Sequence, residues 1–324
     1  MIQKKLVIIV GPTAAGKSAL GVALAKKFNG EIISADSRQL YKGLNIGSGK
    51  ITKNEMMGVP HHLLDIASPK QKFTVAQYQK LALQKIEQIQ NKGKIPFLVG
   101  GSPMYMYSVV DGWTIPEVKP NYKLRTKLQK LDIEELYKML KKLDPRRAQT
   151  IERKNPRRLI RALEIIITTK KPVPLLQKNP LPRLRSSFRR DFGGQAYSVL
   201  FLGIKKSREE LKTLIHNRLL KRLRTNSASP RILQTSMIQE VKKLHHPPTG
   251  KGLSWKRLEE FGLEYRFIAL YLQKKLTYQE MVHQLEKAII DFSRRQMTWF
   301  KKDNRIHWIT NARQAEKLTK EFLS

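Results

Sequence analysis

The chain has 324 residues, and its 63 lysine and arginine residues outnumber 26 acidic residues, so its formal net charge is +37 at pH 7. Hydrophobic residues make up 40% of the sequence, enough for one large domain or two modest ones. Cysteine is absent, which excludes disulfides and thiolate chemistry, and no apolar run reaches the roughly 20 residues that span a bilayer, so we expect a cytoplasmic protein with no membrane partner.

The first hundred residues alternate short apolar strands with helices, which predicts an open parallel α/β sheet. The expected strands are Lys5–Val10, Glu31–Ser34 and Ile95–Val99. The first strand begins too early for a signal or transit peptide to precede it. A helix is expected over Ser18–Asn29, ended by Gly30 in a left-handed conformation, and another begins at Thr74, whose spacing to Gln77 matches a capping box.

Between residues 116 and 195, prolines and basic residues accumulate and the clear patterns are helical. This predicts a helical insertion domain (116–195) within a discontinuous α/β core (1–115 and 196–324). Helices are expected over 131–144 and from Pro156, which Asn155 caps. Later elements are a strand over 197–204, helices over 208–224 (capped by Ser207) and from Thr277 to about Lys302, and a closing strand over 305–309. The segments 183–190, 227–229 and 245–252 are predicted to be mobile.

The strongest motif is a phosphate-binding loop (P-loop) that follows a predicted strand and opens a predicted helix. It reads G-x-x-x-x-G-K-S and consists of Gly11, Pro12, Thr13, Ala14, Ala15, Gly16, Lys17 and Ser18. Its glycines let successive backbone N–H groups point at phosphate oxygens, and the helix N-terminus adds positive charge. Lys17 supplies a point charge, and the Ser18 hydroxyl can ligate Mg²⁺. The motif is typical of nucleotide-binding proteins, including those that bind ATP.

The carboxylate that an NTPase places after an apolar strand, as a second Mg²⁺ anchor, is missing. The strand over 95–99 leads instead into Gly100, Gly101 and Ser102. Asp36 follows the strand over 31–34, at the edge where ligands of open α/β sheets bind. A phosphate site with a carboxylate facing an acceptor favours group transfer over hydrolysis, although Asp36 could also serve as a turn cap.

Six motifs resemble, in the same order, those of the tRNA dimethylallyltransferases, also called tRNA isopentenyltransferases: GPTAAGKS, SADSRQLYKGLNIGSGK, PHHLLDI, GKIPFLVGGSPMYM, NPRRLIRALEI and RRQMTWFKK. The resemblance covers nearly the whole chain and implies a P-loop NTPase-like α/β core with a helical insertion. It also implies a reaction: the dimethylallyl group of dimethylallyl diphosphate goes to N6 of the adenine 3′ to the tRNA anticodon (position 37), and pyrophosphate leaves. The P-loop would then hold a diphosphate rather than ATP.

The resemblance also assigns roles to single residues. Asp36 would accept the N6 proton as N6 attacks the allylic carbon, a contribution typically worth about 10²–10⁴ in rate. Ser102 stands where the family has Thr and would lie beside the amine and the diphosphate. The P-loop, with Mg²⁺, would stabilise the leaving group. Arg218 matches a residue that grips pyrophosphate, although a surface ion pair is an alternative.

The excess positive charge predicts a polyanionic partner, either nucleic acid or an anionic membrane surface, although a lysine-rich genome would produce the same excess. The resemblance points to the anticodon stem-loop of tRNA, from which the target adenine would be extruded. The tRNA contacts that it implies are Asp36, Ser37, Arg38, Gln39, Ser102, Arg125, Arg157, Arg158, Leu159, Ile160, Arg161, Arg294, Arg295, Gln296, Met297, Thr298, Trp299, Phe300 and Lys301. The residue types alone instead place Trp299 and Phe300 in the core.

One segment departs from the family pattern. Where the family commonly reads Ile-Gly-Tyr-Lys/Arg-Glu, this chain has Phe261-Gly262-Leu263-Glu264-Tyr265, which puts the tRNA contact usually carried there in question. Three other functions also remain open: a small-molecule or nucleotide kinase, prenylation of free AMP or ADP, and RNA binding without catalysis. Intact Asp36 and Ser102 argue against the last. We expect a monomer.

Overall fold

The computed structural model describes residues 4–116, 118–174, 197–223 and 236–324. The chain divides into two compact units, unit 1 with residues 1–110 and 181–324, and unit 2 with residues 111–180. The segments 183–190 and 227–229, predicted to be mobile, lie outside the described residues, and so does the predicted end of the insertion at residue 195. The predicted domain bounds therefore stay a prediction.

Unit 1 is built on a six-stranded parallel sheet with the order β3-β2-β4-β1-β5-β6. The strands are β1 (Lys4–Val10), β2 (Gly30–Ala35), β3 (His61–His62), β4 (Ile95–Gly100), β5 (Tyr197–Ile204) and β6 (Ile306–Ile309). The predicted parallel α/β fold is confirmed, and the five predicted strands agree with the structure to within about one residue at each end. The sequence did not predict β3, because two residues carry no detectable alternation.

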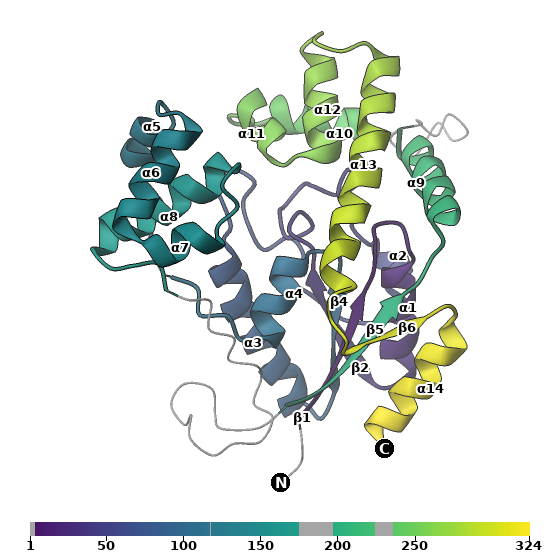
Figure 1. Cartoon of the computed structure of the whole chain (residues 1–324). Coiled ribbons are helices and arrows are strands. Elements are labelled where there is room, and N and C mark those ends of the chain that lie inside the picture. Colours follow the sequence, from purple (N-terminus) through teal and green to yellow (C-terminus); the bar gives the residue numbers. More distant parts are fainter. Residues whose placement is uncertain (1–3, 117, 175–196, 224–235) are drawn as a thin grey trace. The chain divides into compact units, whose positions relative to one another are not determined.

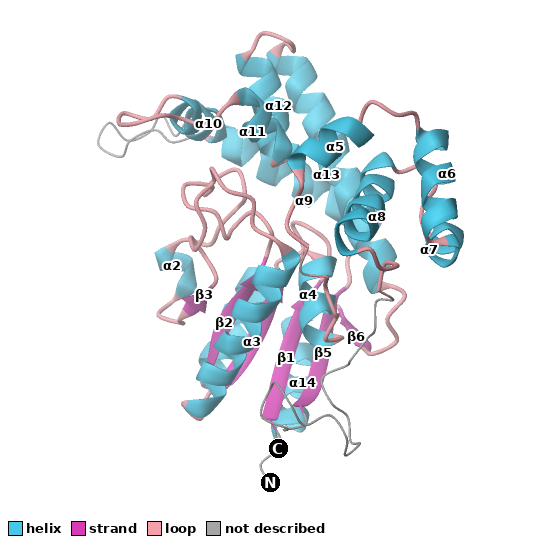
Figure 2. Cartoon of the chain, turned by 90° about the vertical axis from the view of Figure 1, so that its left-hand side faces the viewer, coloured by secondary structure: helices cyan, strands magenta, loops and turns pink. Residues whose placement is uncertain are grey.

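Helices cover both faces of the sheet, which explains why its central strands are apolar at nearly every position. On one face, α1 (Lys17–Lys27) and α14 (Ala312–Leu323) pack against residues such as Val7 and Phe97. On the opposite face lie α3 (Val75–Asn91) and α4 (Pro103–Val110) (Figures 1 and 2). The short α2 (Lys53–Met56) contacts α1.

The predicted capping box at the start of α3 is confirmed, whereas the predicted role of Gly30 at the end of α1 is wrong. Thr74 and Gln77 form the predicted capping box at the start of α3. Gly30, however, does not end a helix in a left-handed conformation; Asn29 takes that conformation, with φ 47°. Gly30 is instead the first residue of β2, where a side chain would overlap the ring of Phe97.

A layer of helices continues unit 1 beyond the carboxyl edge of the sheet (Figure 1). Its members are α9 (Arg208–Leu223), α10 (Met237–His245), α11 (Trp255–Glu260), α12 (Leu263–Leu272) and α13 (Tyr278–Phe300). The predicted caps are present, since Ser207 accepts the N–H of Glu210 and Thr277 forms a capping box with Glu280. These helices surround the edge at which the candidate site lies.

Unit 2 is helical and has a core of its own. Its helices are α5 (Tyr122–Leu128), α6 (Ile133–Leu143), α7 (Pro145–Thr150) and α8 (Pro156–Thr169). Buried leucines such as Leu136, Leu140 and Leu163 join α6 to α8. The predicted cap of α8 is confirmed, because the Asn155 side chain accepts the N–H of Arg158. Across the described parts of both units, no helix combines the length and the apolar character needed to cross a membrane.

Candidate active site

The P-loop joins β1 to α1 as the motif predicts. Gly16, the N-cap of α1, has φ 87°, a left-handed conformation that glycine adopts without strain. The Lys17 ammonium donates to the Pro12 carbonyl oxygen at 2.6 Å, so the lysine folds back across the loop. Ser18 is exposed in the first turn of α1. The loop thus presents a helix N-terminus, a cation and a hydroxyl at one point.

Gln296 of α13 ties the P-loop to the loop after β4. Its side-chain carbonyl accepts the Thr13 N–H at 2.8 Å, and its amide donates to the Gly101 carbonyl at 2.5 Å. A side chain at position 101 would overlap this amide and would lie 3.5 Å from the Lys17 ammonium. Gln296 is only 3% exposed. Both polar ends of the side chain thus hold the site together, and its predicted contact with tRNA stays a prediction.

Asp36 and Ser102 lie at the ends of neighbouring strands, because Ala35 of β2 pairs in register with Gly100 of β4. Asp36 Oδ1 accepts the N–H groups of Arg38 at 2.9 Å and Gln39 at 3.4 Å, so the side chain also caps its own turn. The Ser102 hydroxyl oxygen accepts the Ser37 N–H at 3.1 Å. The two candidate catalytic residues are thus held next to each other at the carboxyl edge of the sheet.

Arg218 of α9 approaches the P-loop rather than forming a surface ion pair. Thr13 and Ala14 line one pocket together with Arg218, and a side chain at Gly49 would overlap its guanidinium. Burial, and next the positive charge of Arg222, lower the pKa of Arg218, while Glu264 and Asp36 act in the opposite direction. Among the residues that the structure describes, none forms a hydrogen bond or an ion pair with Arg218.

The pKa of Lys17 is shifted by the same neighbouring charges. Burial, and next the positive charge of Arg218, lower the pKa of Lys17 to about 8, although the negative charge of Asp36 acts in the opposite direction. Two cations and one carboxylate therefore face one another at the carboxyl edge. Such an arrangement suits an anion held by Lys17 and Arg218, with a proton acceptor beside it.

The other residues of the Asp36 turn are held by contacts within unit 1. Ser37 is exposed, whereas Arg38 forms an ion pair with Glu264 of α12 at 2.5 Å. The Gln39 side chain accepts the Ser34 hydroxyl at 3.2 Å and donates to the Gly49 carbonyl at 3.2 Å. The turn is thus rigidly placed before any ligand arrives.

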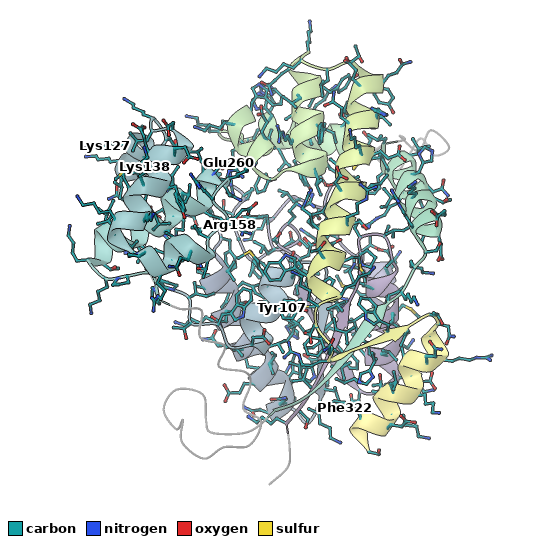
Figure 3. The ribbon with its side chains drawn as sticks, viewed as in Figure 1. Tyr107, Lys127, Lys138, Arg158, Glu260 and Phe322 are labelled. Carbon is teal, nitrogen blue, oxygen red and sulfur yellow. The ribbon has the colours of Figure 1, made fainter. Side chains whose placement is uncertain are left out.

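In unit 2, the predicted tRNA-binding arginines fall into two groups. Arg125 and Arg161 both pair with the fully buried Glu164, at 2.7 and 2.5 Å. Arg157 and Arg158 are exposed on α8. Figure 3 shows Arg158, with Lys127 and Lys138 extending from the surface of the same unit. Leu159 and Ile160, 0% and 7% exposed, pack in the core of unit 2, and their assignment as tRNA contacts stays a prediction.

The predicted tRNA-binding segment 294–301 forms the last turns and the C-cap of α13. Its side chains therefore alternate between the buried and the exposed face of this helix. Phe300 is fully buried, as its residue type predicts, and its assignment as a tRNA contact stays a prediction. Trp299 is 42% exposed, so its prediction as a core residue is wrong. The other exposed members are Arg294, Arg295, Thr298 and Lys301, while Met297 is half-buried.

Three residues that hold the loops of the candidate site escaped the sequence prediction: Arg222, Glu240 and Glu264. Arg222 follows Arg218 at a spacing of four on α9, which places the two on one helix face and was the available signal. Glu264 showed only as a departure from the family pattern. Glu240 accepts hydrogen bonds from the backbone of residues 45–47, a contact across nearly 200 residues that no local pattern encodes.

The fold and the site define a class: a parallel α/β protein of the P-loop NTPase-like type, with a phosphate loop after β1 and a carboxylate after β2. Comparison with known proteins identifies the family within this class. Residues 39–303 match the family model described as IPP transferase. The chain belongs to this family, the tRNA dimethylallyltransferases, and is a prenyl-transferring enzyme. The predicted resemblance is confirmed.

Relatives match over nearly their whole length. A tRNA dimethylallyltransferase of Carboxydothermus hydrogenoformans is 37% identical, with 100% of this chain and 97% of the relative covered. Another, of Corynebacterium diphtheriae, is 38% identical, with 94% and 93% covered.

Solved structures agree. The tRNA isopentenylpyrophosphate transferase of Bacillus halodurans has 31% identity and a TM-score of 0.66, with 99% and 97% of the two chains covered. A eukaryotic dimethylallyltransferase acting on tRNA has 24% identity and a TM-score of 0.73, with 98% of this chain and 77% of that chain covered; it supports the fold.

Proposed function

We propose that this protein transfers the dimethylallyl group of dimethylallyl diphosphate to N6 of adenine 37, the base 3′ to the tRNA anticodon, and releases pyrophosphate. The observation that carries the proposal is the juxtaposition of Asp36 and Ser102 with Lys17 and Arg218. Those two cations suit a diphosphate, and the carboxylate suits an amine that must lose a proton.

The reaction balances with these groups. Adenine N6 attacks C1 of the allyl group, the N6–C1 bond forms, and the C1–O bond breaks as its electron pair leaves with the diphosphate. Asp36 accepts the N6 proton, and Lys17 and Arg218 stabilise the charge that develops on the bridging oxygen. The Ser102 hydroxyl, fixed by the Ser37 N–H, lies where it can hydrogen-bond the amine or the diphosphate.

We propose that a Mg²⁺ ion at the P-loop would be held mainly by oxygens of the bound diphosphate. No group of three or more His, Asp or Glu side chains suited to a metal ion is present among the described residues. The exposed Ser18 hydroxyl, diphosphate oxygens and water would therefore hold the ion, a combination that Mg²⁺ accepts readily. When bound, Mg²⁺ would neutralise charge on the leaving group.

The anticodon stem-loop is the proposed RNA substrate, and unit 2 is proposed to contact it. The exposed cations Arg157 and Arg158 of α8 and Lys127 and Lys138 support a phosphate-binding role for this unit. On α13, the exposed Arg294, Arg295 and Trp299 support a further contact. A tRNA substrate implies a cytoplasmic location, and we retain the prediction of a monomer.

Transfer itself is the test. Dimethylallyl diphosphate labelled in the allyl group is mixed with the enzyme, Mg²⁺ and an anticodon stem-loop carrying adenine at position 37; a stem-loop with guanine there is the matched control. We expect label only in the adenine substrate, on N6 by nucleoside mass spectrometry. Transfer to free AMP or ADP, or ATP consumption without transfer, would contradict the proposal.

A further inference from the structure

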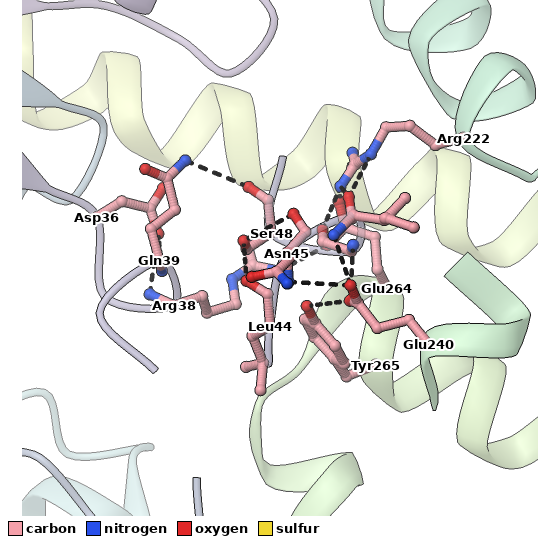
Figure 4. A network of polar contacts seen from close by, with 12 residues as sticks. Asp36, Arg38, Gln39, Leu44, Asn45, Ser48, Arg222, Glu240, Glu264 and Tyr265 are labelled. Carbon is pink, nitrogen blue, oxygen red and sulfur yellow. Dashed lines mark hydrogen bonds and ion pairs between the residues drawn. The ribbon is translucent and has the colours of Figure 1, made fainter. Parts of the chain in front are cut away.

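A buried carboxylate holds Arg38, the cation nearest to Asp36 in the sequence. Glu264 lies in the first turn of α12, and its side chain is 8% exposed. It forms ion pairs with Arg38 at 2.5 Å and with Arg222 of α9 at 3.2 Å (Figure 4). Burial alone would raise the pKa of Glu264, but Arg38 and Arg222 hold it below its ordinary value. Glu264 therefore stays ionised and joins two separate segments.

The same network clamps the chain that follows Asp36. Arg222 donates to the carbonyl oxygens of Ile46 and Gly47. Glu240 of α10 accepts the N–H groups of Asn45, Ile46 and Gly47 at 3.0, 2.6 and 3.0 Å. Because both the carbonyls and the amides of this loop are engaged, the loop has a fixed position, and Arg222 is fixed with it (Figure 4).

Arg38 has a second carboxylate within electrostatic reach. Burial would lower the pKa of Arg38, whereas Glu264 and, next, Asp36 raise it. Arg38 follows Asp36 by two positions, and the Asp36 side chain already accepts the Arg38 N–H. Without Glu264, the guanidinium would be free to pair with the Asp36 carboxylate, which would make that carboxylate a weaker base and occupy an oxygen needed to accept the N6 proton.

We propose that Glu264 is a positioning residue, which holds the Arg38 guanidinium beside the extruded base and keeps it from pairing with the Asp36 carboxylate. The inference rests on the proposed function. Position 264, where the resemblance leads us to expect a basic residue, carries in this chain a buried acid.

The proposal is tested by a substitution that removes the charge of Glu264 but keeps the size and shape of its side chain. Glu264→Gln should lower kcat/KM for the anticodon stem-loop about 10- to 100-fold, the cost of a misplaced active-site group. The KM for dimethylallyl diphosphate should change less than about threefold, because Lys17 and Arg218 remain. Glu260→Gln is the matched control; Glu260 lies four residues earlier, with ion pairs to Lys72 and Arg257 at a more exposed position, and should stay within about twofold of wild type.

A double variant distinguishes positioning from a general loss of packing. If Glu264 acts through Arg38, then Glu264→Gln should cost less than about threefold in an Arg38→Gln background. Full additivity of the two losses would overturn the proposal, and so would wild-type kinetics in Glu264→Gln. Where circular dichroism shows that Glu264→Gln does not fold, Glu264→Asp, which keeps the charge on a shorter side chain, enters the same comparison. Absence of transfer by the wild-type enzyme would instead overturn the proposed function.

Discussion

Unit 1 and unit 2 each contain a buried glutamate between two arginines. In unit 2, Glu164 binds Arg125 and Arg161 and also accepts the Asn121 N–H. In unit 1, Glu264 binds Arg38 and Arg222, but a third arginine, Arg218, reaches the same region. In the first cluster both arginines pair with the glutamate and tie α5 to α8, whereas in the second Arg218 forms no ion pair with the described residues.

Whether a buried arginine has an ion-pair partner within the fold indicates its function better than the number of arginines in the cluster. A buried cation that its own fold does not neutralise is costly unless a ligand supplies the opposite charge. Arg218 and Lys17 form no ion pair with the described residues, and both have a lowered pKa. We therefore propose that Arg218 and Lys17 bind an anion, whereas the Glu164 cluster stabilises the fold.

The largest effect is expected where the carboxylate faces the two cations. Asp36→Asn should lower kcat about 10²–10⁴-fold, because the amide cannot accept the N6 proton, while its oxygen can still accept the Arg38 N–H. Single-turnover transfer measures the loss, and filter binding should show tRNA affinity within about threefold of wild type. A variant that transfers at the wild-type rate would remove Asp36 from the chemistry.

Removing the charge of Arg218 should lower the rate less than removing that of Asp36. Arg218→Gln should lower kcat/KM for dimethylallyl diphosphate about 10- to 100-fold, as expected for the loss of a hydrogen-bonded ion pair with a charged ligand. Lys212→Gln, an exposed change on the same helix, is the control and should have little effect. An equal response of the two variants would assign Arg218 to the surface.

Loss of the Glu164 charge should change stability rather than catalysis, because both arginines of this cluster are paired within the fold. Glu164→Gln should lower the free energy of unfolding by about 1–3 kcal/mol, a moderate cost because Arg125 and Arg161 are 28% and 35% exposed and can turn toward water. Urea denaturation measures it, with the exposed Glu134→Gln as the control. Unchanged stability with a large loss of tRNA affinity would show that this cluster reads RNA.

The smallest effect is expected from pH. Lys17 binds the diphosphate as a cation, and its pKa is lowered to about 8, so its charge is lost as the pH rises through that value. The kcat/KM for dimethylallyl diphosphate should therefore fall roughly tenfold between pH 7 and pH 9. In Lys17→Arg the charge persists to higher pH, and the decline should disappear. A decline that is identical in both enzymes would assign it to another group.

Local patterns predicted the parts of the site that directly follow a strand. The P-loop, Asp36 and Ser102 each follow a strand, and the alternation of strands and helices is sufficient to place all three at one edge of the sheet. Helix periodicity could also have separated Phe300 from Trp299, because the buried face of α13 runs through Ile289, Ser293 and Gln296 to Phe300.

Contacts between distant segments could not be predicted in this way. Glu264 meets Arg38 across 226 residues, and Gln296 meets Thr13 across 283. A glutamate in the first turn of a helix is ordinarily a favourable surface charge, so nothing local indicates that this one is buried between arginines. The reason for a glycine at position 30 was also not predictable locally. A side chain there would overlap the Phe97 ring of a neighbouring strand, whereas the sequence pattern suggested a helix end.

The most direct test is a crystal structure of the enzyme with an unreactive thio-analogue of dimethylallyl diphosphate and an anticodon stem-loop. We expect adenine N6 within hydrogen-bond reach of the Asp36 carboxylate, with diphosphate oxygens bound to Lys17 and Arg218. A diphosphate bound away from these two cations, or an adenine whose N6 faces away from Asp36, would contradict the account.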